Sequence, residues 1–262
     1  MKRQNKRNII IVLTLINVFY SCGIFKGEKT SAVSPNKIII KTNFSTPIYS
    51  VEEINFVNES GFELSGTLFK ARKSKVAIVF AHSFIPDADQ TELFPLAEEL
   101  AELGITSLTF DFPGFGKSEG YIEFDLVDTD VRSAINFLRG LGYSKIASLG
   151  VGVGGLGIAK NALDLVGLIT ISAPTGAMGT LIVTKEDFAI PYPKLFIAAI
   201  DTAGYNKSSG KAARRLYDLS VEPKEILIFS SKYQAMGLFR SEHGKELTEL
   251  IIKFFKTINE KY

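Results

Sequence analysis

Apolar runs of strand length alternate with helical patterns through most of this chain, and that alternation restricts the folds open to it. The strand-like runs cover residues 76–82, 105–111, 145–150, 166–172, 194–200 and 225–230, and the helical patterns cover residues 91–103, 125–139, 155–164, 209–218 and 245–257. Strands separated by helices pair in parallel, and helices bury both faces of a parallel sheet. The sequence therefore predicts an α/β fold with a mostly parallel sheet.

A hairpin precedes this pattern. Residues 53–58 and 62–69 alternate apolar and polar side chains around a turn at residues 59–61, as antiparallel strands do. With 262 residues, of which 46% are hydrophobic, the chain is large enough to bury one substantial core. We expect a single domain over residues 50–262 that begins with an N-terminal antiparallel hairpin.

The first 21 residues read as a secretory signal peptide. A basic start is followed by an apolar run from Ile9 to Tyr20, which is shorter than the roughly 20 apolar residues of a membrane span. Cys22 is the only cysteine and follows Ser21 directly. This arrangement resembles a bacterial lipoprotein signal, which implies that Cys22 is acylated and becomes the mature N-terminus. An ordinary secreted protein with an incidental cysteine is the alternative.

Residues 22–49 are mostly polar, with one short apolar run at residues 37–41. We interpret them as a flexible tether that follows the lipidated Cys22. The expected location is the bacterial cell envelope, outside the cytoplasm, with the acylated Cys22 in a membrane. Past the signal peptide the chain has 26 basic and 28 acidic residues, a balance that gives no basic surface for nucleic acid.

A turn rich in glycine follows the strand-like run at residues 145–150 and allows two interpretations. Gly150, Gly152 and Gly155 satisfy the spacing of a dinucleotide-binding loop. Such a site also needs an acidic residue at the end of the next strand, where this chain has Ser172. Nucleotide binding through these glycines therefore stays an alternative with one of its requirements unmet.

The second interpretation uses residues outside the turn. The segment DFPGFGKSEG at residues 111–120, together with the glycine-bounded turn, resembles the α/β-hydrolase superfamily over residues 50–262. The likeness is greatest to the esterase, lysophospholipase and dienelactone-hydrolase-like branches, which have little or no lid. It implies a G-x-S-x-G turn whose serine attacks the substrate, and that serine position is Gly152 here. Glycine removes the hydroxyl and the strain of a side chain in that turn.

The resemblance also implies where the other catalytic groups belong. The acid position is retained as Asp201, after the strand-like run at residues 194–200. The histidine position aligns with Met236, ahead of a glycine, and methionine cannot transfer a proton. His243 is a candidate for a displaced base, with a solvent-facing residue at the start of a helix as the alternative. Loss of serine and histidine together argues against acyl transfer.

Around the predicted turn, the resemblance assigns an oxyanion loop to His82 and its neighbours, with His82 shaping the loop and not acting as the base. Ser83 replaces the usual glycine there. The N–H groups of Phe84 and Val153 would donate to an oxyanion, since Val153 begins a helix whose dipole favours negative charge.

Other polar residues near these strand ends have structural interpretations. Ser148 and Ser172 lack an identifiable base, and Asp111 belongs to the structural turn at residues 111–120. A solvated loop is the expected setting for the acidic residues at 87, 89 and 92. We predict no metal and no cofactor.

The sequence thus favours a degenerate hydrolase-like domain that binds a small apolar ligand or a protein partner, or acts as a scaffold. The alternative belongs to a different class of function: an enzyme, either an esterase, a lipase or a peptidase, that is active through a rearranged site.

Acylation at Cys22 can be measured directly. Radiolabelled palmitate should label the wild-type chain and not the Cys22→Ala variant, because the thiol is the acylated group. Equal labelling of the two proteins would contradict the lipoprotein interpretation.

Overall fold

The predicted N-terminal hairpin is present in the computed structural model, which describes residues 37–38, 48–201 and 207–262. Strands β2 (Tyr49–Val57) and β3 (Glu63–Ala71) pair in antiparallel register over their whole length. A two-residue strand, β1 (Lys37–Ile38), pairs with the outer side of β2. This strand falls within the segment that sequence analysis assigned to the tether.

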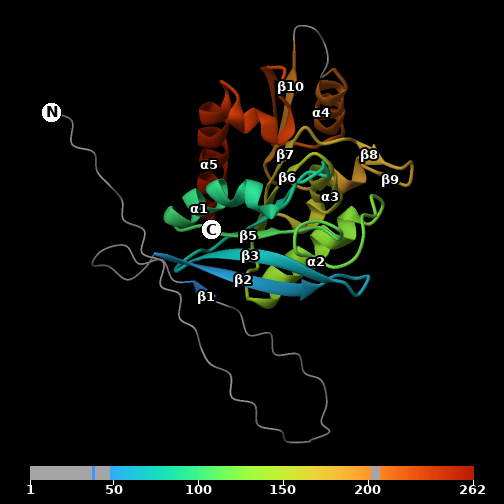
Figure 1. Cartoon of the computed structure of the whole chain (residues 1–262). Coiled ribbons are helices and arrows are strands. Elements are labelled where there is room, and N and C mark those ends of the chain that lie inside the picture. Colours follow the sequence, from blue (N-terminus) through green and yellow to red (C-terminus); the bar gives the residue numbers. More distant parts are fainter. Residues whose placement is uncertain (1–36, 39–47, 202–206) are drawn as a thin grey trace, which may run out of the picture. The chain divides into compact units, whose positions relative to one another are not determined.

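The remaining strands of the large sheet are parallel, as the alternating pattern predicts (Figure 1). The sheet order is β1-β2-β3-β5-β4-β6-β7-β10-β11, and every pair from β5 to β11 is parallel. The parallel strands are β4 (Ala77–Ala81), β5 (Thr106–Phe110), β6 (Ile146–Val151), β7 (Leu168–Ile171), β10 (Lys194–Ile200) and β11 (Lys224–Ser230).

Helices cover both faces of this sheet (Figure 1). Alternate side chains of β4 enter different apolar clusters, with Val79 in one and Phe80 in the other. Helices α1 (Phe94–Glu102) and α5 (Gly244–Lys261) complete the cluster that contains Phe80, whereas α2 (Val127–Gly140), α3 (Val153–Lys160) and α4 (Lys207–Leu219) complete the other.

Shorter elements fill the connections. They are the 3₁₀ turns η1 (Gln90–Leu93), η2 (Ala162–Asp164), η3 (Glu186–Phe188) and η4 (Ala235–Arg240) and a ribbon of β8 (Gly176–Ala177) and β9 (Leu181–Ile182). The helical pattern predicted at residues 155–164 divides into α3 and η2. The division occurs at Asn161, whose side-chain amide donates to the carbonyl of Gly157 at 2.9 Å and so ends α3.

The turn at residues 111–120 fixes the carboxyl end of β5. Asp111 is buried, and its carboxylate accepts hydrogen bonds from the backbone N–H groups of Gln90 at 2.8 Å and Lys117 at 3.0 Å. Gly116 has a φ of 49°, and a Cβ atom there would lie 2.2 Å from the same carboxylate. The turn therefore depends on a glycine at this position, and Asp111 has a structural role.

Helix α2 is joined to the N-terminal hairpin by a buried polar contact. The side-chain amide of Asn58 donates to the carboxyl group of Asp130 at 2.7 Å, and its oxygen accepts the N–H of Phe62. Burial raises the pKa of Asp130 to about 7, and three neighbouring carboxylates add to this effect, while the bond from Asn58 opposes it. The folded chain thus holds Asp130 protonated over a pH range in which the unfolded chain ionises it.

This contact predicts a pH-dependent stability. Since the folded pKa is above the unfolded value of 3.8, the free energy of unfolding should fall as pH rises from about 4 to about 7, by up to about 1.4 kcal/mol per pH unit from this group. The Asp130→Asn variant should lose this part of the pH dependence in denaturant titrations at pH 5 and pH 8. Asp125→Asn, at an exposed carboxylate nearby, is the matched control. Equal pH dependence in all three proteins would contradict the assignment.

Candidate functional site

The glycine-rich turn bends sharply between β6 and α3. Gly152 lies between the two elements with a φ of 56° and a ψ of −125°. Its N–H donates to the carbonyl of Ile171 on the neighbouring strand at 2.9 Å, and its carbonyl accepts the N–H of Gly155 at 3.0 Å. A residue with a side chain adopts such backbone angles only at a cost of about 1–3 kcal/mol. The turn therefore places residue 152 at the carboxyl edge of the sheet, in a conformation that suits glycine.

Close backbone contacts account for the other glycines of the turn. A Cβ atom at Gly154 would lie 2.3 Å from the carbonyl oxygen of His82. One at Gly150 would lie 2.6 Å from the backbone nitrogen of Gly155, and one at Gly155 would lie 2.7 Å from the Cβ of Ala173. Packing within the protein thus requires small residues at positions that a dinucleotide loop would also need.

Ser83 occupies the space beside Gly152 where a side chain would extend. A Cβ atom at residue 152 would lie 2.5 Å from the Oγ of Ser83, a distance that real Cβ atoms do not show. Ser83 is only 4% exposed. Sequence analysis placed both residues at the site but did not predict this contact. The one feature of the sequence that pointed to this contact was the serine at position 83, where the family has glycine after the histidine.

His82 is held by hydrogen bonds at both ring nitrogens. Its Nε2 accepts the backbone N–H of Phe112 at 3.2 Å, which leaves Nδ1 as the protonated nitrogen, donating to the carbonyl of Ser83 at 2.8 Å. Burial lowers the pKa of His82, although the bond to Ser83 and the carboxylates of Asp111 and Asp89 act in the opposite direction. A neutral ring with both nitrogens engaged is suited to holding the loop at residues 82–84 and cannot accept a proton from a nucleophile.

Phenylalanine rings gather over this loop. The ring of Phe84 lies 4.8 Å from those of Phe112 and Phe115 and 5.4 Å from that of Phe124, measured between centroids. In the part of the chain that the structure describes, the N–H groups of Phe84 and Val153 donate to no protein acceptor. The loop and turn therefore combine packed phenylalanine rings with backbone donors.

The predicted base position is occupied by a packed side chain. Met236 is 6% exposed and belongs to the apolar cluster on the α1 and α5 face. The N–H of the preceding Ala235 donates to the Oγ of Ser172 at 3.0 Å, and Ser172 directly follows Ile171, the partner of Gly152. The segment with Met236 therefore lies beside the strand end that contacts the turn.

His243 and Asp201 lie at the ends of the last two strands. The Nε2 of His243 is 3.2 Å from the carbonyl of Ser230, and its ring packs on Phe229 at 4.8 Å. Among its contacts with described residues, none is to the turn at Gly152. Asp201 directly follows β10, at the sheet edge where the acid was expected. The roles assigned to these two residues stay predictions.

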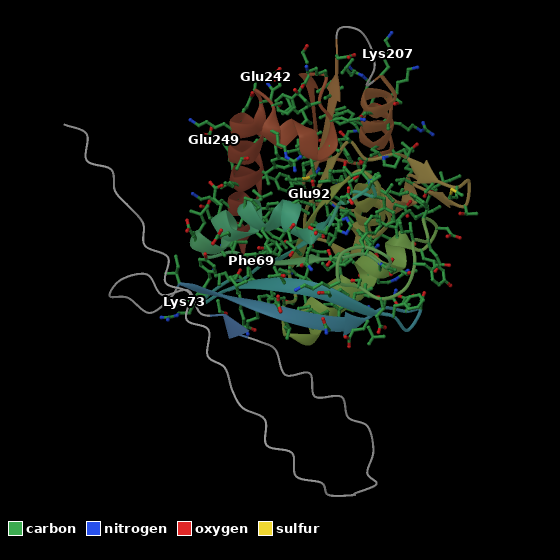
Figure 2. All side chains as sticks on the ribbon, viewed as in Figure 1. Phe69, Lys73, Glu92, Lys207, Glu242 and Glu249 are labelled. Carbon is green, nitrogen blue, oxygen red and sulfur yellow. The ribbon has the colours of Figure 1, made fainter. Side chains whose placement is uncertain are left out.

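Acidic residues near this edge are less solvated than sequence analysis expected. The carboxylate of Asp89 accepts the N–H of Thr91 at 2.8 Å and begins η1. Glu92, labelled in Figure 2, pairs through Oε1 with Arg240 at 3.2 Å, while its buried Oε2 has no hydrogen-bond partner among the described residues. The expectation of a solvated loop was therefore wrong for Glu92, because η1 turns its side chain toward η4.

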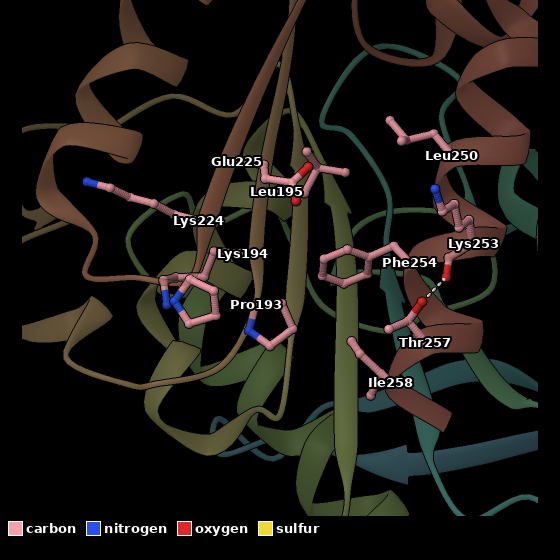
Figure 3. A pocket seen from close by; sticks show the side chains of 11 residues that line it. Pro193, Lys194, Leu195, Lys224, Glu225, Leu250, Lys253, Phe254, Thr257 and Ile258 are labelled. Carbon is pink, nitrogen blue, oxygen red and sulfur yellow. Dashed lines mark hydrogen bonds between the residues drawn. The ribbon is translucent and has the colours of Figure 1, made fainter. Parts of the chain in front are cut away.

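Two cavities lie away from the turn. One of about 220 Å³ lies between α5 and the first residues of β10 and β11, where the ring of Phe254 faces the strands and Lys224 points away (Figure 3). The other, of about 270 Å³, lies between the hairpin and α2 beside Asn58. Neither is lined by Gly152, Ser83 or Met236. Over residues 48–201 and 207–262, no group of three potential ligand residues is placed to hold a metal ion.

Comparisons of the sequence with known proteins find a distant relative. No family model matches the chain. A curated relative, the uncharacterized protein YfhR of Escherichia coli K12, is 23% identical over 237 residues, which is 79% of this chain and 81% of YfhR.

Solved structures are similar over most of the chain. The Pyrococcus furiosus esterase Pf2001 has a TM-score of 0.63 and 16% identity, over 80% of this chain and 93% of its own. XC6422 of Xanthomonas campestris, a serine hydrolase without a lid, has a TM-score of 0.62 and 16% identity, over 80% of this chain and 95% of its own. The α/β-hydrolase GrgF of a Penicillium species has a TM-score of 0.61 and 16% identity, over 80% of this chain and 99% of its own. The chain therefore has the α/β-hydrolase fold, and the predicted fold class is confirmed.

Proposed function

We propose that this protein is an envelope lipoprotein whose hydrolase-like domain binds a ligand or scaffolds a partner without performing acyl transfer. The observation that supports this most is the contact between Gly152 and Ser83. The residue at the nucleophile position has no side chain, and the space for one is occupied by the Oγ of Ser83. Met236, which the family resemblance aligns with the base position, is packed in the core.

Acyl transfer needs a nucleophile and a base within hydrogen-bond reach of each other. Two serines adjoin the turn, Ser83 beside Gly152 and Ser172 directly after its hydrogen-bond partner Ile171. The first is next to His82, which has both ring nitrogens engaged, and the second accepts a hydrogen bond from Ala235. In a comparable serine hydrolase, loss of the nucleophile alone lowers turnover about 10⁶-fold. The arrangement therefore supports binding without chemistry.

Attachment to a membrane is a separate part of the proposal. No helix in the described segments is long and apolar enough to span a bilayer. Cys22 and the signal peptide lie outside the described residues. The proposal that acylated Cys22 is the membrane partner, with the domain outside the cytoplasm, rests on the sequence. An anchor of this kind would leave the hydrolase-like domain free to meet a ligand or protein.

One observation favours the alternative of an active esterase. The turn keeps backbone angles that would strain a residue with a side chain, and the two candidate oxyanion donors have no acceptor among the described residues. Proteins similar in structure are named esterases. Under this alternative, Ser83 or Ser172 attacks and His243 is the base. The contacts of His243 with Ser230 and Phe229 weigh against it. Nucleotide binding is weaker still, because packing already accounts for the glycines.

Restoring the missing groups tests the proposal with short and long p-nitrophenyl esters as substrates. The wild-type protein should give no hydrolysis above background. A Gly152→Ser, Met236→His variant should stay nearly silent, because the new side chain meets the Oγ of Ser83. Adding Ser83→Gly should open that space and produce turnover, which Asp201→Asn should then abolish.

Either of two results would contradict the account. Wild-type hydrolysis that disappears in Ser83→Ala or His243→Ala would show an active rearranged site. A triple variant no faster than the double variant would show that Ser83 does not occupy the nucleophile's space.

A further inference from the structure

Helix α4 presents a row of cations to solvent. The buried side of the helix packs closely on β10, where a Cβ atom at Gly210 would lie 2.3 Å from the side chain of Ile200. On the other side four basic residues follow one another at spacings of four, three and one, which places them on one face of a helix. This basic face consists of Lys207, Lys211, Arg214 and Arg215, all of them exposed.

The basic face does not stabilise the helix that carries it. Like charges three or four residues apart repel each other, and a cation in the first turn opposes the helix dipole. Lys207 begins α4, and no acidic residue lies in that turn. Asp218, the one acid of the helix, lies in its last turn. Neither Asp218 nor the basic face forms an ion pair with a described residue.

Helix α1 has the reverse arrangement. Its exposed side bears three carboxylates in the second half of the helix, Glu98, Glu99 and Glu102, and α1 has no basic residue. Carboxylates near the end of a helix also oppose its dipole. Glu98 accepts a hydrogen bond from the hydroxyl of Tyr49 at 3.0 Å. None of the three carboxylates of this acidic face pairs with a described cation.

The two charged faces cannot meet within one molecule. Helix α1 belongs to the apolar cluster that contains Phe80, and α4 belongs to the cluster that contains Val79, so the two helices cover opposite faces of the sheet (Figure 1). Each helix buries its apolar side against the sheet and exposes its charged side. Contact between the basic and the acidic face therefore requires two copies of the chain.

We propose that the basic face of α4 docks a second copy of this chain through the acidic face of α1. Two different surfaces meet in this contact, so it is heterologous and lets copies add head to tail. One helix against one helix buries little surface, and exposed ion pairs are individually weak. The association is therefore weak and sensitive to salt. It goes beyond the proposed function and is independent of whether the turn at Gly152 performs chemistry.

Sedimentation velocity of the full-length chain in detergent micelles tests the contact. At an ionic strength of about 0.01 M, where the Debye length is about 30 Å, the wild-type protein should form dimers and larger species as its concentration rises. At about 1 M, where the Debye length is about 3 Å, it should sediment as a monomer. At the lower ionic strength, Lys211→Glu, Arg214→Glu and Glu99→Lys, Glu102→Lys should each weaken self-association at least tenfold.

A mixture of these two variants is the sharpest arm of the experiment. The reversed α4 of one variant is complementary to the reversed α1 of the other, so an equimolar mixture should associate within threefold of wild type. Lys253→Glu, Lys256→Glu, at exposed positions of α5, changes the net charge as much as the α4 variant does. This matched control should associate like the wild-type protein.

Thermal unfolding separates docking from a structural role. The α4 variant should unfold at the wild-type temperature or above it, because the substitutions remove repulsion between like charges. A lower unfolding temperature would give the cations a role in the fold and overturn the proposal. So would a wild-type protein that sediments identically at both ionic strengths, a mixture that stays monomeric, or equal weakening by the α5 control.

Discussion

The close approach of the loop after β4 to the first turn of α3 determines what this site can do. Gly154 permits the approach, because any side chain there would meet the backbone of His82. The approach brings the Oγ of Ser83 to 2.5 Å from the place that a Cβ atom of residue 152 would take, so a side chain at 152 requires the Ser83 hydroxyl to move. The present rotamer of Ser83 therefore depends on glycine at 152. The hydroxyl fills the space that the glycine leaves.

The surrounding fold keeps this contact in place from both sides. His82 is fixed by Phe112, which follows β5, and Asp111 fixes the turn after that strand by accepting hydrogen bonds from Gln90 and Lys117. Gly152 is fixed by Ile171 at the end of β7. Because parallel strands end at the same edge of the sheet, segments far apart in sequence hold the loop and the turn together.

Most of the fold could be predicted from the alternation of strand and helix patterns. The apolar side chains of a helix and of a strand recur at different spacings, and the difference is visible over runs of five or more residues. The short ribbon of β8 and β9 could not, because two-residue strands carry no periodicity. At the site, the assignment of Gly152 to the nucleophile position and of Met236 to the base position rests on the family resemblance and stays a prediction. The contact with Ser83 is a distance between segments about 70 residues apart, which a single sequence does not contain. The burial of Glu92 depends similarly on its approach to Arg240.

The central claim is that no serine of this protein acts as a nucleophile. Treatment of the full-length chain with a fluorophosphonate, followed by intact-mass measurement and peptide mapping, tests it most directly, with an active serine esterase as the positive control. The account predicts an unchanged mass under conditions that label the control completely. A stoichiometric adduct on Ser83 or Ser172 would contradict it and identify the serine that performs the chemistry.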